Sequence, residues 1–410
     1  MKILYFHQHF SSPLGSTGIR SYCMSRCLLE RGHKVTLVCG SYLGAKTGLA
    51  GPFINGQRRG IVDGIEVIEF ELNYANIDGF IKRTKIFISY VFRGLKLIFS
   101  ENYDVIFATS TPLTVGIPGI IARWFRNKVF IFEVRDLWPE LPKAMGVITN
   151  PFILKLMSIL EWLSYHSAHH IIALSPGIAD GIEKRGVNLD KISLIPNGCD
   201  LDIFDSEVKS WKPDNIKDSD LLVLYAGTHG MANGLDSVLN AARVLDSRGR
   251  IDIKFIFLGQ GKLKQSLIDR AIRENLRNVI FHKPVDKKKL AGLLSSTDIG
   301  LQILENIPAF YYGTSPNKFF DYISSGVPVL NNYPGWLADL ITDNDCGFVV
   351  SPDNPVEFAN TLEKAANNLP DLKRKGSNAR ELASKKFDRK MLASIWVKKI
   401  ESVYRKRVGK

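Results

Sequence analysis

Short runs of apolar residues recur along this chain, and most of them end at a glycine or at a polar residue. In the first half they cover residues 2–7, 34–39, 65–72, 104–108, 129–134, 171–174 and 192–195. Runs of this length and continuity are typical of parallel strands that are buried on both faces. Segments with apolar residues at helical spacing, such as 20–31 and 113–126, separate them. The alternation predicts an α/β region with a mainly parallel sheet.

The same alternation starts again after a polar stretch at residues 201–219, which we interpret as a linker. The apolar runs of the second half cover residues 221–226, 253–258, 278–282, 298–301, 327–330 and 347–350, and residues 355–410 have helical spacing. Residues 41–60 are rich in glycine and carry Arg58 and Arg59, which indicates a loop. A chain of 410 residues is long enough for two separate cores. The pattern therefore predicts two α/β domains in series.

Glycine-rich loops follow the first strand of each half. Gly15 and Gly18 lie in the first loop, and the second loop begins at Gly227 and ends at Gly234. Ligands of open α/β sheets bind beyond the carboxyl ends of the strands, and backbone N–H groups of such loops can hold a phosphate. Neither loop has the G-x-G-x-x-G spacing, so a dinucleotide site is not supported. For the first loop, a flexible connection remains the alternative.

Arg135 and Asp136 directly follow the predicted strand at residues 129–134. This position allows two interpretations. The side chains can face a ligand at the carboxyl edge of the sheet, or they can form an Arg–Asp ion pair that only holds the loop.

Residues 315–329 predict a loop, a short helix and a buried strand. Ser315 can cap the helix, and Gly326 ends it. Lys318 lies in the first turn, where the helix dipole favours an anion, and a bound phosphate would resolve this conflict. Asp321, one turn further on, can accept hydrogen bonds from sugar hydroxyls. The alternative is an amphipathic helix on which Lys318 and Asp321 are merely solvated.

Residues 79–100 combine large apolar side chains with five cations: Lys82, Arg83, Lys85, Arg93 and Lys96. The charges interrupt the segment too often for a membrane span. Two interpretations remain open: a basic helix that lies on an anionic membrane surface, or a core helix with a cationic outer face.

The net charge of +13 indicates an anionic partner. Nucleic acid, anionic lipid and phosphate-bearing ligands qualify, but no nucleic-acid-binding module is present, and we expect no nucleic acid partner. The five cysteines have no metal-ligand spacing, and we interpret His166, His169 and His170 as packing or surface residues. The odd cysteine count, and an N-terminus that leads directly into a strand, predict a cytoplasmic protein.

Several of these motifs occur together in one order. They are GSTG at residues 15–18, RDLWPE at 135–140, PNGCD at 196–200, GTHG at 227–230, GQG at 259–261, NVIF at 278–281 and SPNKFFDYISSGVP at 315–328. In this set the chain resembles glycosyltransferase family 4, whose members are retaining enzymes of the GT-B fold. The RDLWPE motif resembles the branch that includes bacterial amino-sugar transferases for O-antigen and capsule assembly.

The resemblance implies an α/β fold with two Rossmann-like domains that face each other across a cleft. It implies an acceptor-side domain at residues 1–203, a nucleotide-sugar domain at 204–387, and a last helix at 388–410 that crosses back to the first domain. By the same resemblance, Gly15 and Gly18 face the donor phosphate and the acceptor.

In the second domain the resemblance implies the donor contacts residue by residue. The acidic residue that binds the ribose falls on Asp321, and the helix start that contacts the phosphate falls on Ser315, Asn317 and Lys318. The nucleobase contacts fall on Phe281 and Val285. The loop beside the pyrophosphate falls on Gly227, Thr228, His229 and Asn233.

The sequence departs from the family pattern at two places. Many members carry two glutamates eight positions apart, where this chain has Gly313 and Asp321. Many also place an Arg and a Lys where this chain has Thr228 and Asn233. The contact of the first glutamate and the charge on the pyrophosphate must therefore come from other groups.

We nominate Arg135, Lys318 and His229 for the missing positive charge. Arg135 occupies the position that is often His in the first domain, and we assign catalytic roles to Arg135, Asp136 and Lys318. A retaining transfer in which the leaving phosphate takes the acceptor proton depends mainly on leaving-group stabilisation. No cofactor and no metal are expected.

The predicted function is the retaining transfer of a hexosyl or N-acetylhexosaminyl group from a nucleotide-sugar, with uracil as the favoured base. The acceptor is a saccharide, with a lipid-linked saccharide of surface polysaccharide assembly favoured. Two rivals remain: a sugar-nucleotide epimerase of the same fold, and a non-catalytic protein that binds sugar-nucleotides or nucleic acid.

Overall fold

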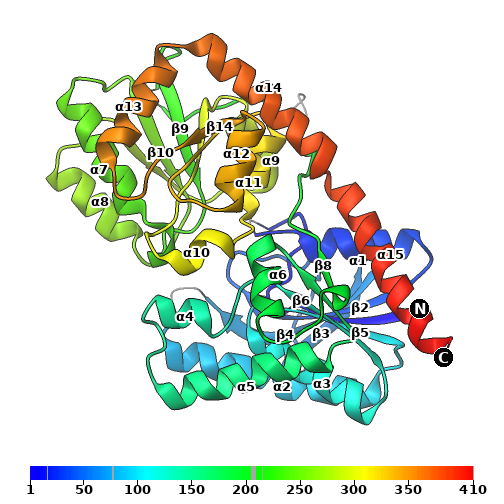
Figure 1. The fold of residues 1–410 in the computed structure, drawn as a ribbon. Coiled ribbons are helices and arrows are strands. Elements are labelled where there is room, and N and C mark those ends of the chain that lie inside the picture. The colour runs from blue at the N-terminus through cyan, green and yellow to red at the C-terminus, as the bar shows by residue number, and fades with distance from the viewer. Residues whose placement is uncertain (16, 76–77, 205–208, 215, 410) are drawn as a thin grey trace. The chain divides into compact units, whose positions relative to one another are not determined.

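The computed structural model describes all residues except 16, 76–77, 205–208, 215 and 410. The chain forms two compact units (Figure 1). The first consists of Met1–Pro196, Gly313–Ser315 and Lys390–Lys410, and the second of Asn197–Tyr312 and Pro316–Arg389. The predicted linker, 201–219, includes residues 205–208 and 215, which lie outside the described part, and its other residues belong to the second unit.

The first unit is built on an eight-stranded sheet. Its strands are β1 (Lys2–Phe6), β2 (Lys34–Tyr42), β3 (Gln57–Val62), β4 (Ile65–Tyr74), β5 (Val105–Thr109), β6 (Val129–Val134), β7 (His170–Ala173) and β8 (Ile192–Leu194). The order is β3-β4-β2-β1-β5-β6-β7-β8, and every neighbouring pair is parallel except β3 with β4. The predicted α/β class and buried parallel sheet are confirmed.

The loop predicted at residues 41–60 is partly wrong, because its end forms the edge strand β3. Arg58 and Arg59 made this segment look like a loop in the sequence. In the structure Arg58 Nε donates to Glu69 Oε2 at 2.8 Å, and Arg59 Nε donates to Glu66 Oε1 at 2.8 Å. Cross-strand ion pairs of this kind allow a charged segment to serve as an edge strand.

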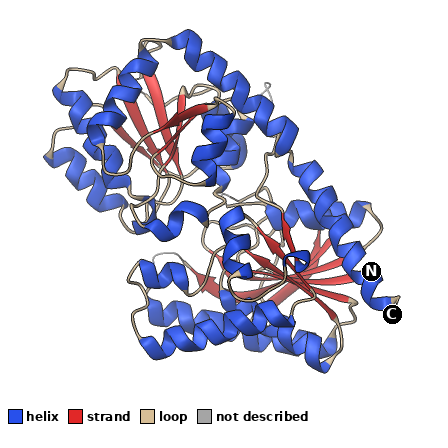
Figure 2. Ribbon diagram, viewed as in Figure 1, coloured by secondary structure: helices blue, strands red, loops and turns tan. Residues whose placement is uncertain are grey.

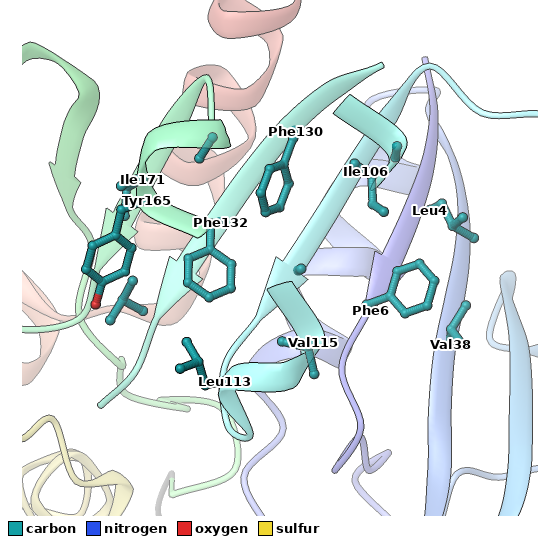
Figure 3. Packing of buried hydrophobic residues seen from close by; sticks show 14 of the residues in the cluster. Leu4, Phe6, Val38, Ile106, Leu113, Val115, Phe130, Phe132, Tyr165 and Ile171 are labelled. Carbon is teal, nitrogen blue, oxygen red and sulfur yellow. The ribbon is translucent and has the colours of Figure 1, made fainter. Parts of the chain in front are cut away.

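Helices cover both faces of this sheet (Figure 2). They are α1 (Arg20–Glu30), α2 (Phe80–Ser100), α3 (Gly116–Phe125), α4 (Glu140–Ala144), α5 (Pro151–Ser167), α6 (Pro176–Glu183) and α15 (Arg389–Val408). One core contains Phe6, Phe130, Phe132 and Tyr165 (Figure 3).

The other core binds the last helix of the chain to the first unit. Trp396 of α15 is fully buried there, stacks on Tyr5 and meets Phe107 edge-on with a centroid distance of 4.7 Å. The helix that ends the chain thus packs on the first unit, as the predicted fold requires.

The second unit contains a six-stranded sheet with the order β11-β10-β9-β12-β13-β14, and all of its pairs are parallel. The strands are β9 (Leu221–Ala226), β10 (Ile253–Leu258), β11 (Val279–His282), β12 (Ile299–Gln302), β13 (Val329–Asn331) and β14 (Gly347–Val349). The helices are α7 (Leu235–Ser247), α8 (Lys264–Arg273), α9 (Lys287–Leu294), α10 (Pro308–Tyr312), α11 (Asn317–Ser324), α12 (Trp336–Asp343), α13 (Pro355–Ala366) and α14 (Leu369–Lys386). The sequence predicted neither α10 nor α12.

Both sheets reverse their order beside the first strand of the unit. In the second unit, numbering the strands along the chain gives the Rossmann order 3-2-1-4-5-6, so the order reverses between β9 and β12. In the first unit the order reverses between β1 and β5. Ligands of such sheets bind at the carboxyl ends of the strands near this switch point. The candidate residues lie at such strand ends: Gly15 and Gly18 follow β1, Arg135 and Asp136 follow β6, and the loop from Gly227 follows β9.

Candidate functional site

In the first unit Arg135 is held at the carboxyl edge of the sheet by neighbours from β1 and β5. Its backbone N–H donates to Ser110 Oγ at 3.0 Å, and its Nη1 lies 3.2 Å from His7 Nε2. Asp136 instead accepts a hydrogen bond from Thr111 Oγ1 at 2.7 Å. Each side chain thus has a partner of its own, and the loop is held by these contacts rather than by an Arg135–Asp136 ion pair.

His7 fixes the guanidinium of Arg135 as a neutral acceptor. Burial and the nearby Arg135 charge lower the pKa of His7 well below its usual value, so the ring is neutral. Arg135 can only donate, so Nε2 of His7 accepts and Nδ1 carries the proton. That proton points to Ser21 Oγ at 2.8 Å, which also accepts from the Tyr5 hydroxyl at 3.1 Å. No pattern in the sequence indicated this series of contacts.

The first glycine loop is packed rather than loosely connected. Gly15 is buried, and its N–H donates to the carbonyl of Ser12 at 3.1 Å. A Cβ at Gly15 would lie 2.2 Å from Ser11 Oγ, so the loop tolerates no side chain there. Gly18 is half-buried just before α1, and Ser16 lies outside the described residues. The donor contact expected of Gly15 and Gly18 remains a prediction.

Sequence reasoning missed Arg20, which ties together the same edge of the sheet. Arg20 is almost fully buried and forms an ion pair with Glu133 at the end of β6, with Nη2 and Oε2 2.9 Å apart. It also donates to the carbonyls of Ile195 and Pro196 at 2.9 and 2.5 Å. Thr109 donates to the other oxygen of Glu133 at 2.8 Å, so the ends of β5, β6 and β8 share one buried polar network.

In the second unit Lys318 lies over the glycine loop that follows β9. Its Nζ is 3.0 Å from Tyr225 Oη, 3.2 Å from Asn233 Oδ1 and 4.3 Å from the centre of the Tyr225 ring. A Cβ added at Gly227 would lie 3.2 Å from Lys318 Cε, so this glycine leaves room for the lysine. Among the described residues no carboxylate pairs with Lys318, and loss of water lowers its pKa to about 7.

The helix that carries Lys318 begins one residue later than the predicted Ser315 cap implies. The cap position of α11 is Pro316, and no side chain caps the helix, so the predicted Ser315 cap is wrong. Its first backbone N–H groups therefore lack a side-chain acceptor from the cap. Within the described part of the chain, the buried Oδ1 of Asn317 also has no hydrogen-bond partner. Uncapped backbone N–H groups can donate to an anion, and the phosphate contact expected for residues 315–318 remains a prediction.

The positive charge that the sequence analysis proposed for His229 is wrong. His229 is completely buried, and burial together with Lys264 and Lys318 lowers its pKa to about 4, so its ring is neutral at pH 7. Its backbone instead joins the loop after β9 to the GQG loop after β10. The His229 N–H donates to the Gln260 carbonyl at 3.0 Å, and a Cβ at Gly261 would lie 2.4 Å from the His229 carbonyl oxygen. Thr228 remains exposed on this loop.

Asp321 is buried and paired with a lysine that the sequence did not single out. Lys287 Nζ lies 2.5 and 2.6 Å from the two carboxylate oxygens of Asp321. Burial raises the pKa of Asp321, while the Lys287 charge opposes that rise. The solvated alternative for Asp321 is therefore wrong. Each carboxylate oxygen keeps a further lone pair, so the ribose contact implied by the resemblance stays a prediction.

Phe281 and Val285 flank the end of β11 and are both half-buried. The Phe281 ring stacks on Phe257 at a centroid distance of 4.9 Å. Lys264, which the sequence did not indicate, joins β10 to β11 by donating to the carbonyls of Gly259 and His282 at 2.8 Å each. The nucleobase contact at these positions remains a prediction.

No group of three His, Cys, Asp or Glu side chains in the described residues is placed to hold a metal ion. The three histidines near β7 have other contacts: His166 stacks on Trp162, His169 accepts from the backbone N–H of Phe130, and His170 lies 2.9 Å from Ser193 Oγ. These contacts agree with the packing and surface roles expected for them. Independence of metals and cofactors stays a prediction.

The fold and the site define a two-domain α/β protein that has a lysine and an uncapped helix start beside the glycine loop at the switch point of its second sheet. Family comparison identifies the class more closely. Residues 18–203 match the family described as Glycosyltransferase Family 4, and residues 208–382 match the family described as Glycosyl transferases group 1. The chain belongs to these glycosyltransferases, and its fold is GT-B.

Curated relatives match about half of the chain. D-inositol 3-phosphate glycosyltransferase from Paenarthrobacter aurescens is 26% identical over 208 residues, which is 48% of each protein. The putative colanic acid biosynthesis glycosyl transferase WcaI from Escherichia coli is 26% identical over 160 residues, or 37% of this chain and 38% of the relative. The chain thus spans about half or less of the length of these relatives.

Solved structures match over nearly the whole chain. Sucrose-phosphate synthase from Thermosynechococcus elongatus has a TM-score of 0.75 at 16% identity, covering 98% of this chain and 99% of that one. Anabaena HepE in complex with UDP-glucose has a TM-score of 0.68 at 17% identity, covering 98% and 100%. WaaG, a glycosyltransferase involved in lipopolysaccharide biosynthesis, has a TM-score of 0.65 at 17% identity and covers 100% of both chains. These matches confirm the predicted fold.

Proposed function

We propose that this glycosyltransferase moves a hexosyl or N-acetylhexosaminyl group from a UDP-sugar to a lipid-linked saccharide, with retention of the anomeric configuration. The observation that carries the proposal is Lys318. It is a cation without a described carboxylate partner, placed at the start of α11 and over the glycine loop of the second unit. A diphosphate would supply both the missing negative charge and acceptors for the free N–H groups.

Uracil is the favoured base because HepE, a structure of similar fold, was solved with UDP and with UDP-glucose. Retention is supported by the family resemblance and by the chemistry proposed for the site. If the leaving phosphate takes the acceptor proton, the enzyme needs cations on the diphosphate more than it needs a protein base. Arg135, presented by neutral His7, is a second cation that can make bidentate contacts with a phosphate.

A lipid-linked acceptor in surface polysaccharide assembly is supported by two similarities and one structural feature. WcaI is named for colanic acid biosynthesis, and WaaG is described as involved in lipopolysaccharide biosynthesis. The feature is α2, which covers residues 79–100 almost completely and carries exposed lysines beside apolar side chains. No described helix is long and apolar enough to cross a membrane. We place the protein in the cytoplasm, with contact to the membrane surface through this helix.

Thermal unfolding with UDP, GDP, ADP and UDP-sugars tests the donor site. A ligand at about a hundred times its Kd stabilises the native state by about 2.7 kcal/mol, which is visible as a higher Tm. We expect UDP and a UDP-sugar to stabilise the wild type, Lys318→Met to lose most of this effect, and Lys364→Met, an exposed lysine of α13, to keep it. Stabilisation by none of the nucleotides in a folded protein would contradict the donor assignment.

Product analysis with membrane extracts as acceptor tests the reaction. The proposal expects transfer to a lipid-extractable saccharide, and NMR of the product should show the anomeric configuration of the donor. Conversion of the UDP-sugar in the absence of acceptor would favour the epimerase instead. Nucleotide binding without turnover on any acceptor would favour the non-catalytic rival.

A further inference from the structure

One side of the first unit carries apolar side chains on its outer surface, formed by α2, α3 and α5. Hydrogen bonds connect these neighbouring helices: Trp124 Nε1 of α3 donates to Ser167 Oγ of α5 at 3.0 Å, and Arg126, just after α3, donates to the Phe99 carbonyl of α2 at 3.1 Å. The exposed large apolar residues of the three helices are Ile81, Ile88, Phe92, Phe99, Trp124, Phe125, Phe152, Leu156, Ile159, Trp162 and Leu163. We call this set the outer apolar face.

The exposed residues form stripes rather than isolated positions. On α5 they are 152, 156, 159 and 163, with Trp162 beside them, and on α2 they are 81, 88, 92 and 99. Separations of three, four and seven residues correspond to whole turns of a helix, so each stripe runs along one side. The opposite sides hold the core residues Tyr90 and Tyr165. Apolar patches that extend over several elements mark a binding surface.

The charges of these helices are almost all positive. α2 carries Lys82, Arg83, Lys85, Arg93 and Lys96, α3 carries Arg123, and α5 carries Lys155. The one carboxylate in the three helices is Glu161, which is buried and forms an ion pair with Arg185 at 2.5 Å. No negative side chain of these helices therefore opposes an approaching anionic surface.

We propose that the outer apolar face of α2, α3 and α5 inserts into the interface of an anionic lipid bilayer. This inference rests on the proposed function for its biological purpose, because it names the surface that brings the enzyme to a lipid-linked acceptor. Large apolar and aromatic side chains flanked by cations match the boundary between acyl chains and anionic head groups. The surface includes α5, so it is wider than the basic segment at residues 79–100.

The topology places this face beside the candidate site of the same unit. Helices that connect parallel strands run opposite to them, so α2, α3 and α5 begin at the carboxyl edge of the sheet. The starts of these helices therefore lie at the edge that presents His7 and Arg135. A saccharide attached to lipid in the same bilayer would approach this edge from the side of the outer apolar face.

Vesicle flotation with matched variants tests the proposal. The vesicles contain either phosphatidylcholine alone or equal parts of phosphatidylethanolamine and phosphatidylglycerol. Leu156→Glu places a carboxylate in the stripe of α5, and Leu369→Glu is the control, because both leucines are 51% exposed and Leu369 begins α14 of the second unit. We expect the wild type and Leu369→Glu to bind the anionic vesicles with similar affinity. Leu156→Glu should bind them at least about tenfold more weakly.

The role of the cations is tested with Lys85→Glu, on the exposed side of α2. This substitution should weaken binding to the anionic vesicles and leave binding to the phosphatidylcholine vesicles unchanged. Moderate salt should reduce wild-type binding without abolishing it, because the apolar contacts are not screened. Equal binding to both kinds of vesicle would overturn the anionic part of the proposal, and equal binding by Leu156→Glu and wild type would overturn the face itself.

Two further measurements separate this inference from the proposed function. UDP should stabilise Leu156→Glu as much as wild type, because Leu156 is an exposed residue of the first unit and the proposed donor contacts of α11 and the loop after β9 belong to the second. If vesicle binding fails while UDP still stabilises the protein, the membrane face is wrong and the donor site stands. If light scattering without lipid shows a dimer that Leu156→Glu dissociates, the face is an interface between two copies and the membrane proposal is overturned.

Discussion

The pH dependence of donor binding provides a direct test of Lys318. In the free protein the pKa of Lys318 is about 7, because the ammonium has lost water and has no described carboxylate beside it. A bound diphosphate would supply opposite charge and raise that pKa toward the ordinary lysine value. Binding should therefore take up a proton above pH 7, and the affinity for UDP should fall as the pH rises.

The magnitude follows from the fraction of charged Lys318. With a pKa of about 7, roughly half of the free protein carries the charge at pH 7 and about one hundredth at pH 9. If the complex keeps the lysine charged, the affinity falls about fiftyfold between these two values. The second ionisation of a terminal phosphate lies near pH 6, so the ligand itself changes little over this range.

Isothermal titration calorimetry of UDP binding at several values of pH measures this dependence. Lys318→Arg is the matched variant, because an arginine stays charged throughout, and its affinity should change little with pH. Repeating one titration in buffers of different ionisation enthalpy shows whether a proton is taken up. An affinity for UDP that is constant between pH 7 and pH 9 in the wild type would refute the reasoning about Lys318.

The stability of the protein without ligand should respond to Lys318 in the opposite direction. Its pKa is lowered in the folded state, so the unfolded chain binds more protons between about pH 7 and the ordinary lysine value. The contribution of this group to stability therefore rises with pH across that range, while donor affinity falls. Comparison of chemical unfolding for wild type and Lys318→Met at both ends of the range isolates the contribution.

Four substitutions test the buried contacts. Asp321→Asn leaves Lys287 buried without its counterion and should cost about 3–5 kcal/mol in urea unfolding, whereas Asp321→Asn combined with Lys287→Met should recover part of that loss. Arg20→Met should likewise cost about 3–5 kcal/mol, and an unchanged unfolding midpoint would contradict the network around Glu133. Gly259→Ala should reduce soluble yield or Tm, because its Cβ would lie 1.8 Å from the Gly227 carbonyl oxygen; a wild-type Tm would show that the two loops can separate.

The strands of both sheets were predictable because their apolar runs are continuous and bounded by breakers. The runs at 129–134, 221–226 and 253–258 coincide with β6, β9 and β10. The edge strand β3 was missed because its two arginines interrupt the apolar pattern expected of a strand. Their partners, Glu66 and Glu69, belong to a different strand. Local patterns cannot identify a strand whose stability comes from cross-strand ion pairs.

For the site, the sequence predicted the strand ends but not the partners that orient the side chains there. It singled out Arg135, Lys318 and Asp321, but not His7, which is 128 residues from Arg135 in the chain. It also assigned a charge to His229, whose complete burial depends on the fold of two loops. Such contacts depend on tertiary structure and leave no periodic signal in a single sequence.

The two lysines near α11 show why an anionic ligand is the simplest account of the second unit. Lys287 is buried, and the fold supplies Asp321 as its counterion at 2.5 Å. Lys318, on the same helix as that aspartate, has only the neutral Tyr225 and Asn233 as described hydrogen-bond partners and lies at the positive end of the helix dipole. Buried charges that lack a counterion reduce folding stability and are found mainly at functional sites. The fold supplies a counterion for Lys287 and none among the described residues for Lys318, so we expect the diphosphate of the proposed donor to supply the missing negative charge.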